Sequence, residues 1–253
     1  MADVFTASLK DKLWHRLRAD LAQYAPQVEA NQLLMCCVCG RFLKREDFSL
    51  EHIVPRRALK LDPDPVRRDP ATPENVRARN LLLCTKPLLD RRNRGYRNGC
   101  NSWKGRFYDK PIADLLGTWD WMSRKSLAGN HMTAALCLGY LAMVEEFGYR
   151  VVLMQSGLLL RKQFFNPRKL LNEVPSISQM LLGGSADGMK HDAPVWAEPF
   201  SFSFEQPGVC FVVMRNFGMA IPVTQDPRLP IARRLRFAPA KYTMRPDFTA
   251  VFD

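Results

Sequence analysis

The sequence predicts an α+β protein in which a small cysteine-rich module lies between an N-terminal helix and a C-terminal region of mixed helices and strands. Leucines recur every four residues near the N-terminus, which is helical spacing. Two short apolar segments, residues 48–54 and 80–84, are flanked by turn formers, as strands are. Hydrophobic residues make up 47% of the 253 residues, enough to bury a sizeable core. The expected parts are residues 1–32, 33–125 and 126–253.

The N-terminal segment, residues 7–25, is predicted to form an amphipathic helix. Its apolar stripe consists of Leu9, Leu13, Leu17 and Leu21. Basic and acidic residues balance over residues 1–35, at 4 of each. We therefore expect this helix to pack on the central module rather than to contact DNA.

The central module is predicted to contain two strands, two loops and a helix. Between the two apolar segments, residues 61–75 hold four prolines, which indicates an exposed loop. A second insertion, residues 85–99, separates the later strand from a helix that begins near Cys100.

The sequence after the module shows both helical and strand patterns. Pro111 is expected to open a helical segment that Gly117 interrupts. The clearest helix of the chain is expected between a cap at Asn130 and an end at Gly148. A short helix is expected before the turn at Gly183-Gly184. The expected strands are Val151–Met154, Phe200–Phe204 and Cys210–Met214.

The charge of the chain indicates a polyanionic partner, with nucleic acid first and DNA preferred. The net charge is +12 at a sequence pI near 9.6. Residues 36–108 hold 17 Lys and Arg against 8 Asp and Glu, a net of +9, so most of the excess lies on the central module. Phosphate-binding charge therefore coincides with the candidate chemistry described next.

Hydropathy and cysteine usage predict a soluble, cytoplasmic protein with no membrane association. Nothing resembles a signal peptide, and the longest mostly apolar run, Thr133–Val144, is too short to cross a bilayer. We therefore expect reduced thiols. In such a compartment, paired cysteines bind metal more often than they form disulfides.

Four of the seven cysteines have a spacing that predicts a structural zinc site. Cys36 and Cys39 form a Cys-x-x-Cys pair, and Gly40 suits the tight turn that follows. Cys84 and Cys100 supply the second half of the ligand set, although fifteen residues separate them. Zn²⁺ prefers four such ligands in a tetrahedron, and its binding would contribute directly to the folding of so small a module.

The other three cysteines are assigned differently. Cys37 is an alternative ligand at the first corner, although Cys37-x-Cys39 is a less favourable chelate. Cys137 and Cys210 are expected to be small core residues.

The cysteines are interleaved with polar residues at fixed places. The motifs are Cys36-x-x-Cys39, Glu51-His52-Ile53-Val54-Pro55, Asn80-Leu81-Leu82-Leu83-Cys84 and Cys100-Asn101-x-x-Lys104. In this order they resemble the HNH endonuclease family over residues 33–108. The resemblance implies a ββα-metal fold, in which a two-stranded ribbon and a helix hold a divalent ion. Together with the flanking segments predicted above, the expected architecture is an HNH nuclease module with an N-terminal helix and a C-terminal mixed α+β domain.

The resemblance also implies a role for each polar residue of these motifs. His52 would be the general base that deprotonates water, because an imidazole can accept a proton near neutral pH. Glu51 and Asn101 would bind a catalytic Mg²⁺ or Mn²⁺, since such hard cations prefer oxygen ligands. Asn80 would fix the loop that carries His52. The expected catalytic set is His52, Asn80 and Asn101. The family commonly has Asp at the position of Glu51.

Nucleic-acid contacts are expected from the second insertion and the following helix. The expected phosphate-binding residues are Arg91, Arg92, Arg94, Arg97 and Lys104. The insertion lies between two zinc ligands, so it would be tethered beside the metal site. We expect backbone contact without sequence readout.

These patterns favour an HNH endonuclease that cuts or nicks DNA, in phage defence or mobile-element biology. One alternative is a catalytically weak, zinc-containing nucleic-acid-binding module. Another is a nuclease effector gated by a partner or signal at its C-terminal domain. The same domain is the expected place of contact with a protein partner or of homo-oligomer formation. Segments of that domain, such as Ala134-Ala135-x-x-Leu138 and Phe147-Gly148-Tyr149, resemble the accessory half of some bacterial HNH proteins of undefined role.

Overall fold

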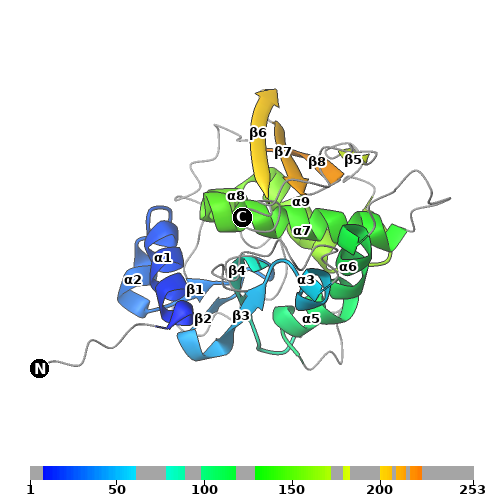
Figure 1. Ribbon diagram of the computed structural model, residues 1–253. Coiled ribbons are helices and arrows are strands. Elements are labelled where there is room, and N and C mark those ends of the chain that lie inside the picture. Colours follow the sequence, from blue (N-terminus) through cyan, green and yellow to red (C-terminus); the bar gives the residue numbers. More distant parts are fainter. Residues whose placement is uncertain are drawn as a thin grey trace, which may run out of the picture. The chain divides into compact units, whose positions relative to one another are not determined.

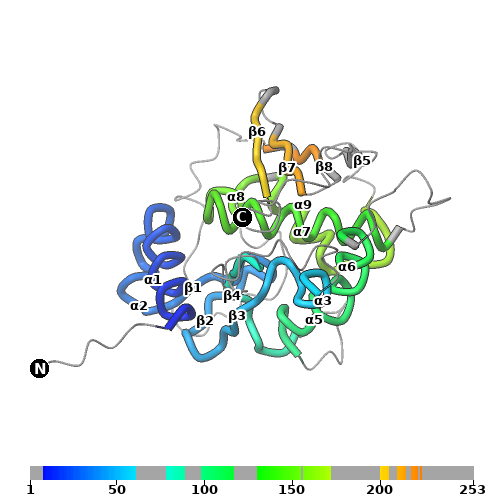
Figure 2. The backbone as a smooth tube through the Cα atoms, in the orientation of Figure 1, coloured from blue at the N-terminus to red at the C-terminus, as the bar shows by residue number. Residues whose placement is uncertain are grey.

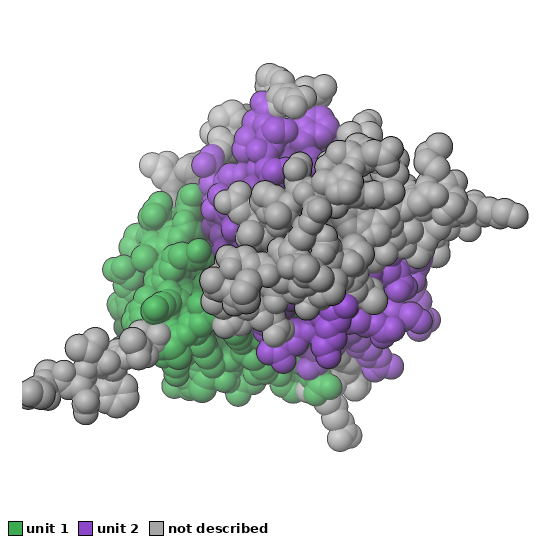
Figure 3. All heavy atoms as spheres, in the orientation of Figure 1, with its two compact units in different colours: residues 1–51, 81–101, 228–253 green, residues 52–80, 102–227 purple. Residues whose placement is uncertain are grey.

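The computed structural model of the chain describes residues 8–60, 78–88, 98–117, 129–171, 179–182, 200–206, 209–214 and 217–223 (Figure 1). These ranges combine helices with small sheets, which confirms the predicted α+β class. The chain divides into two compact units. Unit 1 comprises residues 1–51, 81–101 and 228–253, and unit 2 comprises residues 52–80 and 102–227 (Figure 3).

Unit 1 begins with the predicted amphipathic helix, α1 (Leu9–Ala22), which is followed by the short helix α2 (Gln27–Asn31). The hydroxyl oxygen of Ser8 caps α1 by accepting a hydrogen bond from the Asp11 amide at 3.2 Å. The buried residues of α1 are Leu13, Trp14, Leu17 and Leu21. Most of the predicted leucine stripe therefore faces the core, where α1 packs against α2 and the first strand.

A short hairpin follows in unit 1. Strands β1 (Leu34–Met35) and β2 (Phe42–Leu43) pair antiparallel, and the turn between them contains residues 36–41. The Gly40 amide donates a hydrogen bond to the Cys36 carbonyl at 2.9 Å, and Gly40 has φ 72°. Left-handed backbone favours glycine, which is why a glycine follows the Cys-x-x-Cys pair.

The remaining elements of the central module are β3 (Phe48–His52), β4 (Asn80–Cys84) and α5 (Cys100–Phe107). A 3-10 turn, η1 (Arg45–Asp47), leads into β3. β3 and β4 form a two-stranded sheet, and the boundary between the units passes within β3, β4 and α5. The two strands and the helix therefore occur where the sequence predicts them, whereas the ββα-metal fold stays a prediction.

Unit 2 contains a long buried helix, α7 (Gly129–Phe147). The other described helices of this unit are α3 (Arg56–Lys60), α6 (Asp109–Gly117), α8 (Tyr149–Leu153) and α9 (Gln155–Phe164). α7 is buried continuously from Thr133 to Val144, as its apolar sequence predicts. It packs against α6, α8 and α9, and its course can be followed in Figure 2. No helix in the described ranges is long and apolar enough to cross a membrane.

A four-stranded antiparallel sheet completes unit 2. Its strands are β5 (Gln179–Leu182), β6 (Ser201–Gln206), β7 (Val209–Met214) and β8 (Phe217–Pro222), in the order β5-β8-β7-β6. α7 lies against β8 at Gly139, where a Cβ atom would come within 3.0 Å of Ile221 Cδ1. The strand predictions for residues 200–204 and 210–214 are confirmed.

Four expectations for unit 2 are wrong. The predicted strand Val151–Met154 is mostly helix α8, and the segment before Gly183 is strand β5 rather than a short helix. α8 packs closely on α9, since a Cβ atom at Gly157 would lie 2.0 Å from the Val151 carbonyl oxygen. Tertiary packing thus outweighs the strand preference of its valines. α6 begins at Asp109, so Pro111 is its third residue rather than its first. α7 begins at Gly129, so Asn130 is its second residue rather than its cap.

Candidate functional site

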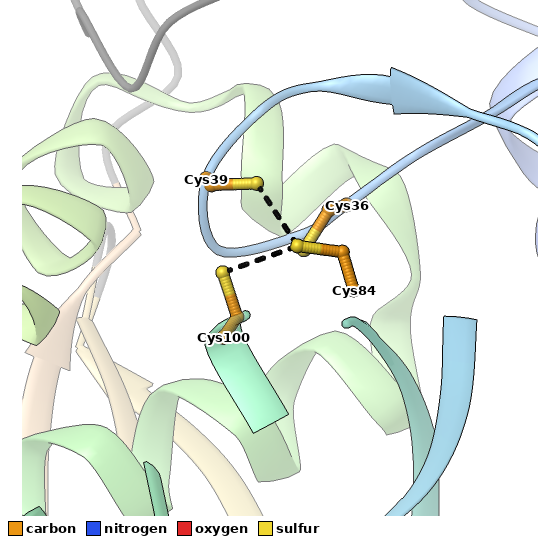
Figure 4. Close-up of side chains that lie close together, drawn as sticks. All are labelled: Cys36, Cys39, Cys84 and Cys100. Atoms are coloured by element: carbon orange, nitrogen blue, oxygen red, sulfur yellow. Dashed lines mark hydrogen bonds between the residues drawn. The ribbon is translucent and has the colours of Figure 1, made fainter. Parts of the chain in front are cut away.

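Four cysteines from three places in the chain meet in unit 1 (Figure 4). Cys36 and Cys39 lie in the turn of the β1–β2 hairpin, Cys84 ends β4, and Cys100 begins α5. All four side chains are buried, and their sulfur atoms lie within 4.8 Å of one another. The predicted ligand set is therefore assembled from residues up to 64 positions apart.

The sulfur spacing fits a metal ion. Cys84 Sγ lies 3.6 Å from both Cys39 Sγ and Cys100 Sγ. A Zn–S bond of about 2.3 Å gives a tetrahedron with edges of about 3.8 Å, whereas a disulfide bond would require about 2.05 Å. None of the seven cysteines, all of which lie in the described ranges, forms a disulfide bond. The cluster can thus hold a metal ion such as zinc.

The other cysteines lie outside this cluster. Cys37 is buried but does not belong to the four-sulfur group, so the alternative ligand assignment is wrong. Cys137 on α7 and Cys210 on β7 are buried core residues, as predicted.

Gly99 brings the separated Cys84 and Cys100 together. A Cβ atom at Gly99 would lie 2.2 Å from the Cys84 carbonyl oxygen and 2.5 Å from the Thr85 Cα atom. No side chain fits against backbone at such distances. The start of α5 therefore packs directly on the end of β4, which places both sulfur atoms at the cluster.

Arg41 is a component of the cluster that the sequence analysis missed. Arg41 is the last residue of the hairpin turn, and it is buried, with 6% of the residue exposed. Nε donates to Cys39 Sγ at 3.3 Å, and Nη2 donates to Cys84 Sγ at 3.1 Å. The signal in the sequence is an arginine immediately after Cys-x-x-Cys-Gly. One of its sulfur partners, Cys84, lies 43 positions away in the sequence, so the sequence alone did not reveal this contact.

The surroundings of the cluster shift the pKa values of Cys39 and Cys100 in opposite directions. Burial raises the pKa of Cys39, but hydrogen bonds from Cys100, Cys36 and Cys84 and the charge of Arg41 outweigh it, so this pKa is well below its usual value. Burial raises the pKa of Cys100 well above its usual value, and bonds to Cys36 and Cys39 raise it further. The surroundings thus favour the thiolate at Cys39 and the protonated thiol at Cys100. A metal ion that binds four thiolates releases the protons that the thiols carry.

The proposed cation ligands Glu51 and Asn101 both belong to unit 1. Glu51 is the fourth residue of β3, and its side chain is 7% exposed. Asn101 is the second residue of α5, and its Nδ2 donates to Ser49 Oγ at 2.7 Å and to the Leu50 carbonyl at 3.1 Å. These bonds fasten the start of α5 to β3 and fix the orientation of the Asn101 amide.

The proposed catalytic residues His52 and Asn80 lie in unit 2. His52 ends β3 and is half-buried, whereas Asn80 begins β4 and is buried. Beyond these residues the two chain segments stay paired, because the Ile53 amide donates to the Arg79 carbonyl at 3.0 Å. The backbone before His52 is therefore part of β3, and the backbone after it is hydrogen-bonded to Arg79.

Lys104 does not lie at the surface, where the expected phosphate contact would require it to be. Its side chain is 0% exposed, and Nζ donates to the His52 carbonyl at 2.8 Å and to Asp109 Oδ1 at 2.8 Å. Because the ammonium group is fully buried, a contact between Lys104 and phosphate would require the side chain to leave this environment. The expected contacts of Arg91, Arg92, Arg94 and Arg97 lie outside the described residues, as does the predicted loop of residues 61–75.

The chain matches none of the protein-family models, curated proteins or solved structures with which it was compared.

Proposed function

We propose that the chain is a metal-dependent endonuclease of the HNH kind that hydrolyses phosphodiester bonds in DNA. In this proposal His52 is the general base, and Glu51 and Asn101 bind a Mg²⁺ or Mn²⁺ ion. Asn80 fixes the segment that carries His52. The four-cysteine cluster holds a structural zinc ion that fixes the ends of the module.

The observation that carries this proposal is the way α5 is fastened to β3. Asn101 bonds to the residues before Glu51, and Lys104 bonds to the backbone of His52 directly after it. A helix thus fixes the strand segment that bears the candidate ligand and the candidate base. Such fixed geometry is what hydrolysis requires, because the base and the metal must hold their positions while charge develops.

The charge of the chain also supports a nucleic-acid substrate. Most of the net positive charge falls within residues 36–108, the stretch that contains the candidate residues. Such a charge excess attracts phosphates without base specificity. DNA is proposed as the substrate on the resemblance to HNH endonucleases.

The test incubates zinc-loaded protein with supercoiled plasmid in Mg²⁺ or Mn²⁺. The wild-type protein is expected to nick or cut the plasmid. His52→Ala is expected to lower the rate by about 10²–10⁴-fold, the usual contribution of a general base. His15→Ala is the matched control, because His15 is an exposed histidine on α1. Cleavage that survives His52→Ala unchanged would overturn the assignment of the base.

The second candidate function is a zinc-containing module that binds nucleic acid with little catalysis. The burial of Glu51 favours it, because a side chain with 7% exposure leaves little room for an ion that must also bind substrate and water. In the same experiment, tight, salt-sensitive plasmid binding without cleavage would support this alternative.

A further inference from the structure

Arg41 is a buried cation, and burial of a charge is costly unless the charge is paired. Its partners are the sulfur atoms of Cys39 and Cys84, which come from different parts of the chain. One guanidinium therefore spans the hairpin and the β4 parts of the four-cysteine cluster.

The other donors of the guanidinium bind the chain just after Cys84. Nη1 donates to the Pro87 carbonyl at 2.7 Å, and Nη2 donates to the Lys86 carbonyl at 2.8 Å. These four bonds use the planar fork that only arginine provides. They attach both the sulfur atoms and the adjoining backbone to a single side chain.

Arg41 also offsets part of the negative charge that a metal-loaded cluster would carry. Four thiolates around a divalent ion carry a net charge of about −2, which is unfavourable in a buried site. One guanidinium in contact with two of the sulfur atoms reduces that charge by one unit. Hydrogen bonds from a cation to an anion are also about twice as strong as those between neutral groups.

We propose that Arg41 is a positioning residue of the metal centre, which aligns Cys39 with Cys84 and strengthens metal binding through its charge. The inference rests on the proposed zinc centre and not on nuclease activity. Outer-shell partners of this kind commonly contribute about 10–100-fold to metal affinity.

The test measures the zinc dissociation constant of the full chain by competition with a chromophoric chelator. Arg41→Gln removes the charge, and Arg41→Lys keeps the charge but lacks the fork. Lys44→Gln is the matched control, because Lys44 is an exposed cation three residues away in the same unit. We expect about 10–100-fold weaker binding for Arg41→Gln, partial recovery for Arg41→Lys and no change for Lys44→Gln.

A spectroscopic readout separates an effect on the sulfur atoms from a general loss of folding. In Co²⁺-loaded protein, the sulfur-to-cobalt charge-transfer band should move to lower energy in Arg41→Gln, because thiolates that lose a nearby cation donate electrons more readily. The band of Lys44→Gln should not move. If Arg41→Gln does not fold, the cobalt band of Arg41→Lys is compared with the wild-type band instead. Arg41→Lys keeps the positive charge, so its band should stay near the wild-type position.

Three results would overturn the inference. Zinc affinity and cobalt band of Arg41→Gln that equal the wild-type values would overturn it while leaving the metal centre intact. Equal losses in Arg41→Gln and Lys44→Gln would show that only overall charge matters. A folded wild-type chain that binds neither zinc nor cobalt would overturn the metal centre itself.

Discussion

The ammonium group of Lys104 donates a hydrogen bond to the backbone carbonyl of His52 at 2.8 Å. The same Nζ atom forms an ion pair with Asp109, the first residue of α6. A fully buried lysine held by a carbonyl and a carboxylate fixes backbone rather than meeting solvent. Helix α5 thereby holds the end of the strand that carries the proposed general base.

Lys104→Met is expected to lower the cleavage rate by about tenfold or more, because a displaced base loses its alignment with water and phosphate. Plasmid binding should persist. The measurements are single-turnover cleavage rates and binding at several salt concentrations. If Lys104 contacted phosphate instead, the slope of log affinity against log salt would fall by about one.

Lys110→Met is the matched control for this prediction. Lys110 is an exposed lysine on α6, so its loss removes the same charge without touching β3. Equal cleavage by both variants and the wild type would contradict a positioning role for Lys104.

The strands and helix of the central module and the four-cysteine cluster could be predicted because residue type and spacing mark them. The bounds of β4 match the apolar segment 80–84, and the cluster joins the cysteines that the motif spacing selected. Cysteine ligands are recognisable because few other residues bind zinc. The turn glycine, Gly40, was equally predictable because its conformation depends on the turn alone.

The environment of each cation could not be predicted in the same way. Nothing in the sequence distinguishes Arg41 from the other basic residues of the module, and Lys104 is expected there to contact phosphate. Both are buried against partners 43 to 52 positions away. Long-range burial leaves no periodic signal in the sequence. The strand prediction for Val151–Met154 was wrong for a related reason. The packing of α8 against α7 and α9 outweighs the preference of valine for strands.

Gly99→Ala is expected to weaken zinc binding by at least about tenfold. The added methyl group would collide with the Cys84 carbonyl and the Thr85 backbone, and neither can move without displacing a ligand. The measurement is the zinc dissociation constant, with the zinc content of purified protein as a first indication.

Gly105→Ala provides the control for Gly99→Ala. A Cβ atom at Gly105, on the same helix, would lie 3.6 Å from Asp109 Oδ2, which is an ordinary contact. Alanine also favours helix over glycine by about 1 kcal/mol. Gly105→Ala should therefore keep zinc, and zinc loss from both variants would contradict the role assigned to Gly99.

The ion pair between Arg79 and Glu145 should contribute measurably to stability. Arg79 Nε donates to Glu145 Oε2 at 2.7 Å, and the two side chains are 28% and 11% exposed. Glu145 lies in the last turn of α7, where the helix dipole disfavours acidic groups unless a cation compensates. A double-mutant cycle with Arg79→Gln and Glu145→Gln, followed by urea unfolding, should give a coupling of about 0.5–1 kcal/mol. Additive effects of the two substitutions would contradict the pair.

Tyr108→Phe is expected to lower the free energy of unfolding by about 1 kcal/mol at neutral pH. The Tyr108 hydroxyl donates to the Phe164 carbonyl at 2.8 Å, at the end of α9. Burial, with a smaller contribution from the charge of Cys137, raises the pKa of Tyr108 well above its usual value. The folded protein therefore favours the neutral phenol.

This shift fixes the sign of a pH effect. Because the folded-state pKa is raised, the contribution of Tyr108 is fully present below the unfolded pKa of about 10 and is lost as the pH rises above it. The wild-type protein should therefore lose stability more steeply than Tyr108→Phe above about pH 10. Urea unfolding of both proteins at neutral and alkaline pH measures this difference. A stability gap that stays constant across pH 10 would mean that Tyr108 ionises equally in the folded and unfolded chains.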